Sequence, residues 1–364
     1  MKKIRVSFLT DKEFDKKSIT TQLETTLLSS SQENKIILKK ILDEFNNNNF
    51  SLITPQEIQF INNHSSEILS EYLIFRYKFK NYPKNQIDSN IPQHLIIEPT
   101  SACNLRCVFC YQVDEDFTEN YMGSMDFKLF KKIIDDAFEI GVKAITLTGR
   151  GEPTLNPKIG EMLEYCSGKF FDLKMNTNAT RLNEKLIHQI LKSGVTDLVF
   201  SVDSYEKEEY ESIRIRGIFE NVLNNIKKFK EIKDNFYPNS KCATRISGVK
   251  INASLDSEIF KKYWEKYVDH VVLVELQERW DTYNNPIENA GKGPCNYLWG
   301  EMNIWFDGLC NPCDVDYKSE LSVGNIQQQN IKEIWDGEKY KNLRNLHKSG
   351  KRNTCHPCDR CSSW

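Results

Sequence analysis

From about residue 91 onward, short apolar runs alternate with longer amphipathic stretches. The amphipathic stretches, such as 127–140 and 219–232, have the spacing of helices. The apolar runs predict six strands, at residues 94–99, 143–148, 172–177, 197–203, 242–248 and 270–277. Six strand–helix units in series predict an α/β fold with a parallel sheet and right-handed crossovers, either open or curled towards a barrel. Ligands of such folds collect at the C-terminal ends of the strands.

Residues 1–90 have a different pattern, which is polar and mostly helical. Apolar residues recur at helical spacing before a run of Asn, at Ile36, Ile37, Ile41, Leu42 and Phe45. Thr54 precedes Glu57 by three positions, which is a capping arrangement for a helix expected to run towards residues 76–79. Two interpretations stay open: a helical arm that packs on the core, or an element that recognises a substrate or leader peptide.

Length and charge limit the possible classes. A chain of 364 residues exceeds the usual size of a single core, so we expect two units plus an extension. The balance of 49 basic and 51 acidic residues offers no large field for nucleic acid or an anionic membrane. No apolar run is long enough to span a membrane or to form a signal peptide, so a cytoplasmic location is expected.

The eleven cysteines are unevenly distributed, with nine of them in two groups, at 103–110 and 295–361. In a long chain without an export signal, such clustering predicts metal ligation in a reducing compartment rather than disulfides. Cys166 and Cys242 stand apart and are expected to be packed thiols.

The first group, Cys103, Cys107 and Cys110, directly follows the first predicted strand. Three thiolates at this spacing can converge if the backbone curls after the strand. They leave one corner of a four-iron cluster without a protein ligand. By analogy with zinc sites, an open position is typical of a centre that performs chemistry. A partial zinc site or three buried thiols is the alternative.

This run resembles the signature of the radical S-adenosylmethionine (SAM) superfamily, with the aromatic Phe109 just before the third cysteine. The resemblance implies a partial (β/α)6 TIM-like barrel over 91–285 and a 4Fe–4S cluster whose open iron binds the amino and carboxylate groups of SAM. It further implies that an electron, delivered by a small flavodoxin or ferredoxin type of protein, splits SAM into methionine and a 5′-deoxyadenosyl radical.

A glycine-containing element follows the second predicted strand. Gly149 and Gly151 allow the backbone to approach a ligand closely, and Glu152 can accept a hydrogen bond from an ammonium group. The element resembles the family's GGEP motif, which holds the SAM amino group. Arg150 replaces the usual second glycine.

Polar side chains follow one face of the next three predicted strands. Asn176 lies on the third, Ser201 and Asp203 on the fourth, and Arg245 on the fifth. The resemblance implies that Ser201 and Asp203 contact the SAM ribose or the substrate, and that Arg245 binds the SAM carboxylate. For Asp203, capping the following helix is the alternative.

The sixth predicted strand has one apolar face, with Val272, Val274 and Leu276, which is expected to pack on helices. The other face carries three candidates for a polar substrate pocket: Glu275, Gln277 and Arg279. An exposed edge strand with a wet outer face is the alternative.

The second cysteine group contains the pair Asp307-Gly308 between apolar runs, a strong signal for a hairpin that would bring Cys295 and Cys310 together. By spacing alone, zinc and iron–sulfur are equally admissible. Residues 286–364 resemble the SPASM domain or its shorter twitch relative, which carry one or two auxiliary clusters. The resemblance thus implies an N-terminal extension at 1–90, a core at 91–285 and this small C-terminal domain at 286–364. The first choice of ligands is Cys295, Cys310, Cys355 and Cys358. Cys313 and Cys361 could complete or replace one of them.

The resemblance therefore predicts a radical SAM enzyme with at least one auxiliary 4Fe–4S cluster. A peptide substrate is favoured, and an amino sugar or another carbohydrate is the alternative. A zinc-binding interaction protein is the competing class. The near-neutral charge and the separate glycine-containing element argue against it.

Overall fold

The computed structural model describes residues 16–47, 57, 60, 66–276 and 281–363, and the chain divides into two compact units, Met1–Ile87 and Asp88–Trp364. The first unit contains helices α1 (Lys16–Ser29), α2 (Gln32–Asn46) and α4 (Ser66–Lys84). Helix α2 buries Ile37, Ile41, Leu42 and Phe45 of the predicted apolar stripe together with Leu38, whereas Ile36 is 51% exposed. The helix ends at the Asn run. Thr54 lies outside the described residues. Glu57 is buried and forms ion pairs with Arg76 (2.7 Å) and Lys80 (2.6 Å).

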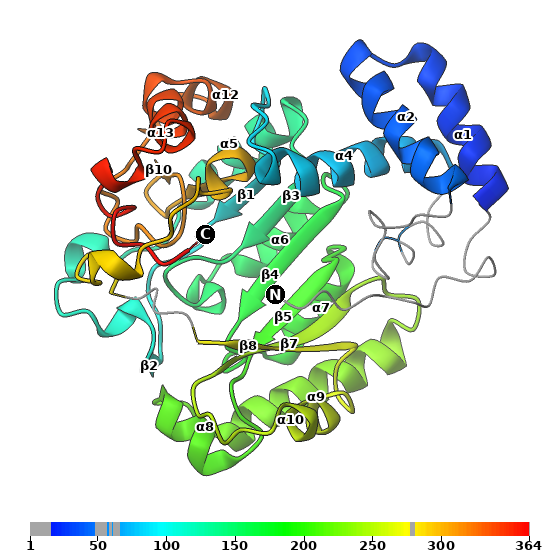
Figure 1. Cartoon of the computed structure of the whole chain (residues 1–364). Helices are drawn as coiled ribbons and strands as arrows, with labels where there is room; N and C mark the ends of the chain where they lie inside the picture. Colours follow the sequence, from blue (N-terminus) through cyan, green and yellow to red (C-terminus); the bar gives the residue numbers. More distant parts are fainter. Residues whose placement is uncertain (1–15, 48–56, 58–59, 61–65, 277–280, 364) are drawn as a thin grey trace. The chain divides into compact units, whose positions relative to one another are not determined.

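The second unit is built on a nine-stranded sheet with the order β11-β10-β9-β1-β3-β4-β5-β7-β8 (Figure 1). Its six central and edge strands are all parallel and confirm the predicted series: β1 (His94–Ile97), β3 (Ala144–Leu147), β4 (Asp172–Thr177), β5 (Asp197–Ser201), β7 (Ala243–Lys250) and β8 (His270–Glu275). The fold is therefore the α/β class that the hydrophobic pattern indicated.

The C-terminal segment extends this same sheet. Strand β9 (Glu301–Ile304) pairs in parallel with β1, and β10 (Leu309–Asn311) and β11 (Gly324–Asn325) follow antiparallel. The predicted turn joins β9 to β10, and Gly308 adopts a φ of +83° that favours glycine. The domain boundaries predicted near residues 90 and 285 stay predictions. Strands on both sides of residue 285 belong to the same sheet.

Helices connect the parallel strands and cover the sheet. They are α5 (Phe127–Glu139), α6 (Ile159–Cys166), α7 (Glu184–Lys192), α8 (Lys207–Ile213), α9 (Phe219–Phe236) and α10 (Ser257–Trp264). The C-terminal helices are α11 (Tyr297–Gly300), α12 (Ile331–Trp335) and α13 (Glu338–Lys348). A small second sheet pairs β2 (Arg106–Cys107) with β6 (Arg214–Ile215). No helix within the described ranges has both the length and the apolar character needed to cross a membrane.

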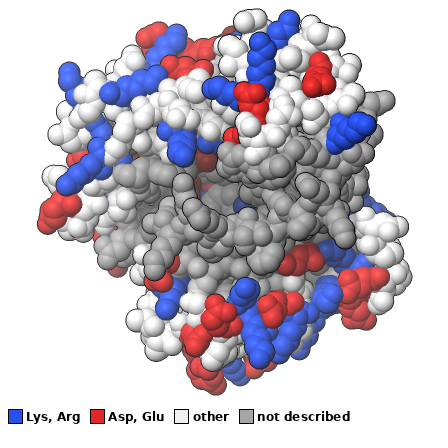
Figure 2. All heavy atoms as spheres, turned by 45° about the vertical axis from the view of Figure 1, so that its right-hand side comes forward, with Lys and Arg blue, Asp and Glu red and all other residues white. Residues whose placement is uncertain are grey.

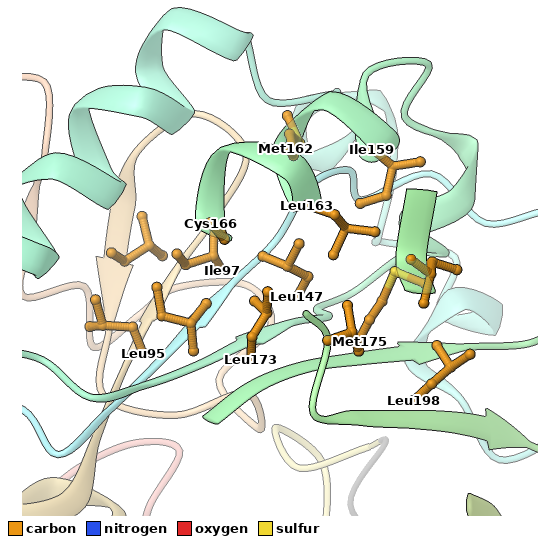
Figure 3. Packing of buried hydrophobic residues seen from close by; sticks show 14 of the residues in the cluster. Leu95, Ile97, Leu147, Ile159, Met162, Leu163, Cys166, Leu173, Met175 and Leu198 are labelled. Carbon is orange, nitrogen blue, oxygen red and sulfur yellow. The ribbon is translucent and has the colours of Figure 1, made fainter. Parts of the chain in front are cut away.

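The main hydrophobic core lies on the helix side of the sheet. Alternate strand residues such as Leu95, Leu147 and Met175 are fully buried there and pack on α6 (Figure 3). The same cluster includes Trp299 and Trp335 from the C-terminal segment. Since full burial of one such side chain contributes about 1.5–3 kcal/mol, the shared core ties the C-terminal segment firmly to the parallel sheet.

Strand β8 has the opposite orientation from the predicted one. Val271 and Leu273 pack against the core, whereas Val272 and Val274 are 38% and 47% exposed and lie on the face of β7 that carries Ser247. The expectation that Val272 and Val274 pack on helices was wrong. Both faces of this edge strand carry apolar residues, so alternation could not select the buried one.

The reversal affects the three substrate-pocket candidates. Glu275 is exposed and shares the parity of Leu273, the side of the strand that packs on the core cluster. Gln277 and Arg279 lie outside the described residues. The position of Glu275 therefore does not support the polar substrate pocket that was predicted from this strand.

Candidate functional site

The three-cysteine loop leaves the C-terminal end of β1, and its middle part forms β2. Burial, together with the negative charges of Cys107 and Cys103, raises the pKa of the Cys110 thiol to about 12. Burial is also the main reason why the pKa of Cys103 rises to about 11. The three thiols thus lie close enough for their charges to act on one another, and like all eleven cysteines they form no disulfide.

A buried arginine stands beside these thiols. Arg214 of β6 lies opposite Cys107 in the small sheet, and its Nη1 donates to the Cys107 Sγ at 3.9 Å. Its Nε donates to Asp203 Oδ2 at 2.7 Å, and Asp203 Oδ1 accepts from the backbone N–H of Val249 at 2.9 Å. The Phe109 ring is 6.0 Å from the guanidinium. Asp203 therefore holds a cation next to the cysteine loop. No sequence signal pointed to Arg214.

The glycine-containing loop 149–152 packs directly on the cysteine loop. A Cβ on Gly151 would lie 2.3 Å from the carbonyl oxygen of Ala102, and one on Gly149 would lie 2.7 Å from the side chain of Glu98. Tyr111, which follows the third cysteine, donates to the Gly149 carbonyl at 3.0 Å. Gly151 is required by this close approach of two backbone segments, and Gly149 by the contact with the Glu98 side chain.

Glu152 is buried among hydrogen-bond donors at the ends of β3 and β4. Its carboxylate accepts from the Thr154 N–H and hydroxyl (3.1 and 2.6 Å), the Thr177 hydroxyl (2.7 Å) and the Asn178 N–H (2.6 Å). Burial raises the pKa of this carboxyl, and the four donors act in the opposite direction. Its charge also raises the pKa of Cys103. Glu152 thus lies beside the cysteine loop, where a carboxylate that binds a ligand of that loop is expected.

Other predicted contacts lie on the sheet face away from the main core. Ser201 is in register with Ser247 there. Arg245 donates from Nη2 to Asp197 at 3.0 Å, and its buried Nε has no hydrogen-bond partner among the described residues. The same holds for the buried Oδ1 of Asn176. These atoms are available to a polar ligand.

Two asparagines that sequence reasoning missed lie opposite each other in the C-terminal hairpin. Asn303 of β9 and Asn311 of β10 are paired in register and fully buried. Neither amide has a hydrogen-bond partner within the described part of the chain. Fully buried amides normally have partners, so this pair is a further candidate for contact with a ligand or bound water.

The second cysteine group converges near the C-terminus, with one exception. The Cys313 thiol feels the charges of Cys295 and Cys358, and Cys358 in turn feels Cys361 and Cys355. Burial is the largest cause of the raised pKa at both thiols. These five cysteines form one electrostatic group.

Cys310 is the exception. It is fully buried in the main hydrophobic cluster, and its Sγ lies 3.6 Å from the Gly308 carbonyl oxygen. Its pKa is raised by burial and by the Asp307 carboxylate. Cys310 is directly opposite Ile304, and residues opposite each other in an antiparallel pair project to the same face. The hairpin therefore turns Cys310 into the core, although it was among the first-choice ligands.

Arg352 organises the terminal cysteine loop. It is 5% exposed and donates to the carbonyl oxygens of Cys358 (3.1 Å), Cys361 (2.8 Å), Gly293 (3.0 Å) and Ser363 (2.7 Å). His347 is equally buried, and its Nδ1 accepts from the Cys295 N–H at 3.2 Å. Burial, and then the charge of Arg352, lower the pKa of His347 to about 4. Neither residue carried a recognisable sequence signal.

The donor sets fit iron–sulfur clusters. Thiolates are their usual protein ligands, and the N–H groups and the guanidinium near the first group can offset the charge of such a cluster. Among the described residues, no three His, Cys, Asp or Glu side chains are arranged to hold a metal ion. A cluster spreads its cysteines over several iron atoms, so its ligands do not have to meet at one point.

Two family models match the chain. Residues 97–251 match the radical SAM superfamily, and residues 295–362 match the SPASM iron–sulfur cluster-binding domain. The first match runs from Ile97, the last residue of β1, through β7 and includes the cysteine loop, and the second covers the later cysteine group.

Curated relatives differ in what their names describe. A tungsten-containing aldehyde ferredoxin oxidoreductase cofactor-modifying protein of Pyrococcus furiosus is 37% identical over 30% of this chain and 31% of its own length. The antilisterial bacteriocin subtilosin biosynthesis protein AlbA of Bacillus subtilis is 25% identical over 68% and 60%. A GTP 3′,8-cyclase of Desulforamulus reducens is 26% identical over 50% and 55%. The chain thus spans between about a third and three fifths of the length of these relatives.

Solved structures share the fold. Streptococcus suis SuiB bound to the precursor peptide SuiA has a TM-score of 0.57 and 17% identity over 82% of this chain and 76% of its own. The protein anSMEcpe with bound AdoMet has a TM-score of 0.55 and 18% identity over 74% and 88%.

The matched domains imply a SAM-binding 4Fe–4S cluster and at least one auxiliary cluster. The three-cysteine loop at the C-terminal end of β1 lies in the first match and the second cysteine group lies in the second, and these matches show that the chain contains a radical SAM superfamily domain followed by a C-terminal SPASM domain.

Proposed function

We propose that the chain is a radical SAM enzyme, in which SAM bound at a 4Fe–4S cluster on Cys103, Cys107 and Cys110 supplies a 5′-deoxyadenosyl radical that abstracts hydrogen from a peptide. One observation carries the proposal: the three interacting thiols and the loop 149–152 pack together at the C-terminal ends of parallel strands, where ligands of such folds bind.

The chain's own residues would hold and orient the reactants. Arg214 offsets the negative charge of the thiolates, and Asp203 fixes Arg214 in place. The carboxylate of Glu152 and the free atoms of Asn176 and Arg245 are our candidates for the polar ends of SAM. The close fit of Gly151 against Ala102 leaves little room for water between the two loops. The cofactor carries the difficult chemistry, and the protein contributes position and electrostatics.

Metal analysis tests the class of protein. We expect anaerobically purified protein to be brown and to contain iron and sulfide, with about four iron atoms per cluster. A small reduced flavodoxin or ferredoxin should support 5′-deoxyadenosine formation from SAM, as measured by chromatography and mass spectrometry. Colourless protein with stoichiometric zinc would instead establish the zinc-binding interaction protein.

A peptide is the substrate class that we favour. The match to AlbA, a bacteriocin biosynthesis protein, covers 68% of this chain. Unpaired buried amides such as Asn303 and Asn311 offer both donors and acceptors, as a peptide backbone does. The polar face predicted for β8 suited a peptide backbone and a carbohydrate equally, so its reversed orientation does not choose between them.

The substrate class can be tested with a low-molecular-mass extract of the source cells. We expect the extract to raise 5′-deoxyadenosine formation by about tenfold over the extract-free rate, because a bound substrate is positioned for reaction. Digestion with proteinase K should remove this stimulation, and periodate oxidation should leave it. Stimulation that survives the protease and is lost to periodate would favour the amino sugar or carbohydrate.

For the auxiliary cluster, we propose Cys295, Cys313 and Cys358 as ligands, with Cys355 or Cys361 as the fourth. The mutual charge effects of these thiols support this choice. The pKa of the Cys310 thiol, by contrast, is raised by burial and by Asp307 and not by another cysteine, which argues against Cys310. Arg352 keeps the terminal loop in a conformation that presents its cysteines. A cytoplasmic, reducing location would suit such clusters.

A further inference from the structure

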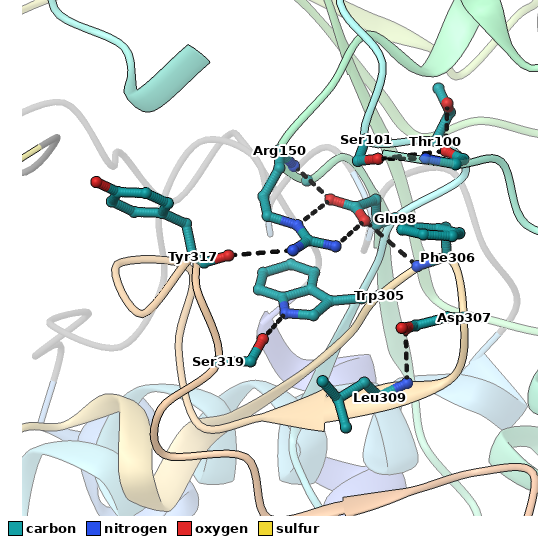
Figure 4. Close-up of polar contacts among 12 residues, drawn as sticks. Glu98, Thr100, Ser101, Arg150, Trp305, Phe306, Asp307, Leu309, Tyr317 and Ser319 are labelled. Atoms are coloured by element: carbon teal, nitrogen blue, oxygen red, sulfur yellow. Dashed lines mark hydrogen bonds and ion pairs between the residues drawn. The ribbon is translucent and has the colours of Figure 1, made fainter. Parts of the chain in front are cut away.

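Arg150 stands where the GGEP motif has its second glycine, and its side chain is almost fully buried. Its Nε donates to Glu98 Oε2 at 2.9 Å, and its Nη2 donates to Glu98 Oε1 at 2.7 Å (Figure 4). The backbone N–H of Arg150 also donates to Glu98 Oε2, at 2.7 Å. Glu98, at the end of β1, thus holds both the side chain and the backbone of the loop 149–152.

The other contacts of this pair come from the C-terminal segment. Nη1 of Arg150 donates to the Tyr317 carbonyl at 3.0 Å, and the guanidinium lies 4.4 Å from the Trp305 ring. The backbone N–H of Phe306 donates to Glu98 Oε1 at 3.3 Å. The ion pair therefore links β1, the loop 149–152 and the SPASM segment in one buried contact, as Figure 4 shows.

A second connection runs beside it. The Tyr317 ring stacks on Tyr111 with 4.7 Å between the ring centroids. Tyr111 follows Cys110 and donates to the Gly149 carbonyl. Tyr317 lies only four positions after Cys313, the proposed auxiliary ligand. One short segment of the SPASM domain thus contacts both the cysteine loop and the loop 149–152.

The buried ion pair of Arg150 and Glu98 depends on the position of the SPASM segment. Burial alone would lower the pKa of Arg150, but the Glu98 carboxylate outweighs burial and raises it, so the guanidinium stays charged. A buried ion pair is favourable only when its geometry is good and its remaining donors are satisfied. Here one of those donors is satisfied by the Tyr317 carbonyl. A displaced 313–317 segment would leave a buried charge with an unpaired donor.

We propose that Arg150 is a positioning residue through which the SPASM domain controls the SAM-side loop 149–152. The inference rests on the proposed function in naming SAM as the ligand of that loop. Its mechanical part does not: the segment from Cys313 to Tyr317 orders Arg150, and Arg150 with Glu98 orders the backbone of Gly149 to Glu152. A disturbed auxiliary site should therefore loosen the SAM site.

Amide hydrogen exchange and SAM affinity test this in a double-mutant cycle with anaerobically reconstituted protein. Cys313→Ala disturbs the auxiliary site. The double variant Glu98→Gln with Arg150→Met removes the ion pair and keeps most of the side-chain volume. It is preferred to Arg150→Gly, which would leave the Glu98 carboxylate buried without its partner and destabilise the fold. Cys310→Ala is the matched control, since Cys310 lies in the same hairpin but in the core. Thermal unfolding verifies that each variant is folded.

We expect Cys313→Ala to speed exchange of the amides 149–152 and to weaken SAM binding by about tenfold, a size typical of coupling between two sites. Cys310→Ala should change neither. In the ion-pair variant, Cys313→Ala should add less than about twofold, because the connection is already broken. Equal effects of Cys313→Ala in both backgrounds, or no effect on exchange in either, would overturn the inference. If wild-type protein binds no SAM, but Cys313→Ala still speeds exchange of the amides 149–152, the proposed function is rejected and the mechanical part of the inference stands.

Discussion

Replacement of Cys103, Cys107 and Cys110 together by Ala is expected to abolish SAM cleavage and to lower the iron content by about four atoms per chain. The three thiols are the only protein ligands that the proposal gives to the first cluster. Without them nothing holds the cluster beside the loop 149–152. Mass-spectrometric detection of 5′-deoxyadenosine, with iron and sulfide analysis of the same samples, measures both effects. The auxiliary cluster should remain, so the variant should stay coloured.

Cys166→Ala and Cys242→Ala are the matched controls for this variant. Both thiols are buried in the main hydrophobic cluster, and no other cysteine is among the causes of their raised pKa values. Each replacement should cost about 1 kcal/mol of unfolding free energy and leave the iron content unchanged. SAM cleavage that persists in the triple variant would reject the assignment of the first cluster.

Cys313→Ala is expected to remove the auxiliary cluster, whereas Cys310→Ala is expected to keep it. The two cysteines are three positions apart, so any general effect of replacing a thiol in this hairpin should be shared. Only Cys313 interacts with Cys295 and Cys358, and its loss leaves the cluster a ligand short. Cys310→Ala leaves a small cavity in the core and should lower the unfolding free energy by about 1 kcal/mol.

Iron analysis and electron paramagnetic resonance of the reduced proteins separate these outcomes. The signal of the first cluster should persist in both variants, and its response to added SAM should be weaker in Cys313→Ala. If Cys310→Ala lost the auxiliary iron and Cys313→Ala retained it, the ligand set inferred from the sequence would be restored.

Surface charge agrees with the composition. Basic and acidic side chains are interspersed over the described residues on the face drawn in Figure 2. The balanced totals of 49 and 51 predicted that no large field of one sign would form, and this face agrees with that prediction.

The parallel core could be predicted from the sequence because its signal is local. A buried parallel strand reads as a short apolar run, and the helices between the strands have their own period. Strand β4 was predicted at 172–177 and is observed at Asp172–Thr177. The cysteine spacing and the loop 149–152 are also local, so their place at the ends of β1 and β3 followed once the strands were known.

The orientation of β8 and the roles of Cys310 and Arg150 could not be predicted in this way, because they depend on tertiary contacts. Val271 and Val272 are the same residue type, and only the packing of β8 beside β7 determines which one faces the helices. Cys310 and Cys313 look alike in the chain, and the register against Ile304 separates them. Arg150 appeared to be a departure from a motif until Glu98 and Tyr317 were seen around it.

By itself, the sequence determined the order of strands and helices, the chemistry of the two cysteine groups and the family resemblance. These follow from residue type and short-range spacing, which need no knowledge of distant contacts. The tertiary structure alone decided which face of β8 is buried, which cysteine of the hairpin can reach the second group, and how Arg150 joins the SAM-side loop to the SPASM segment. These depend on register and on partners up to 208 positions apart, which pair only when the sheet has formed.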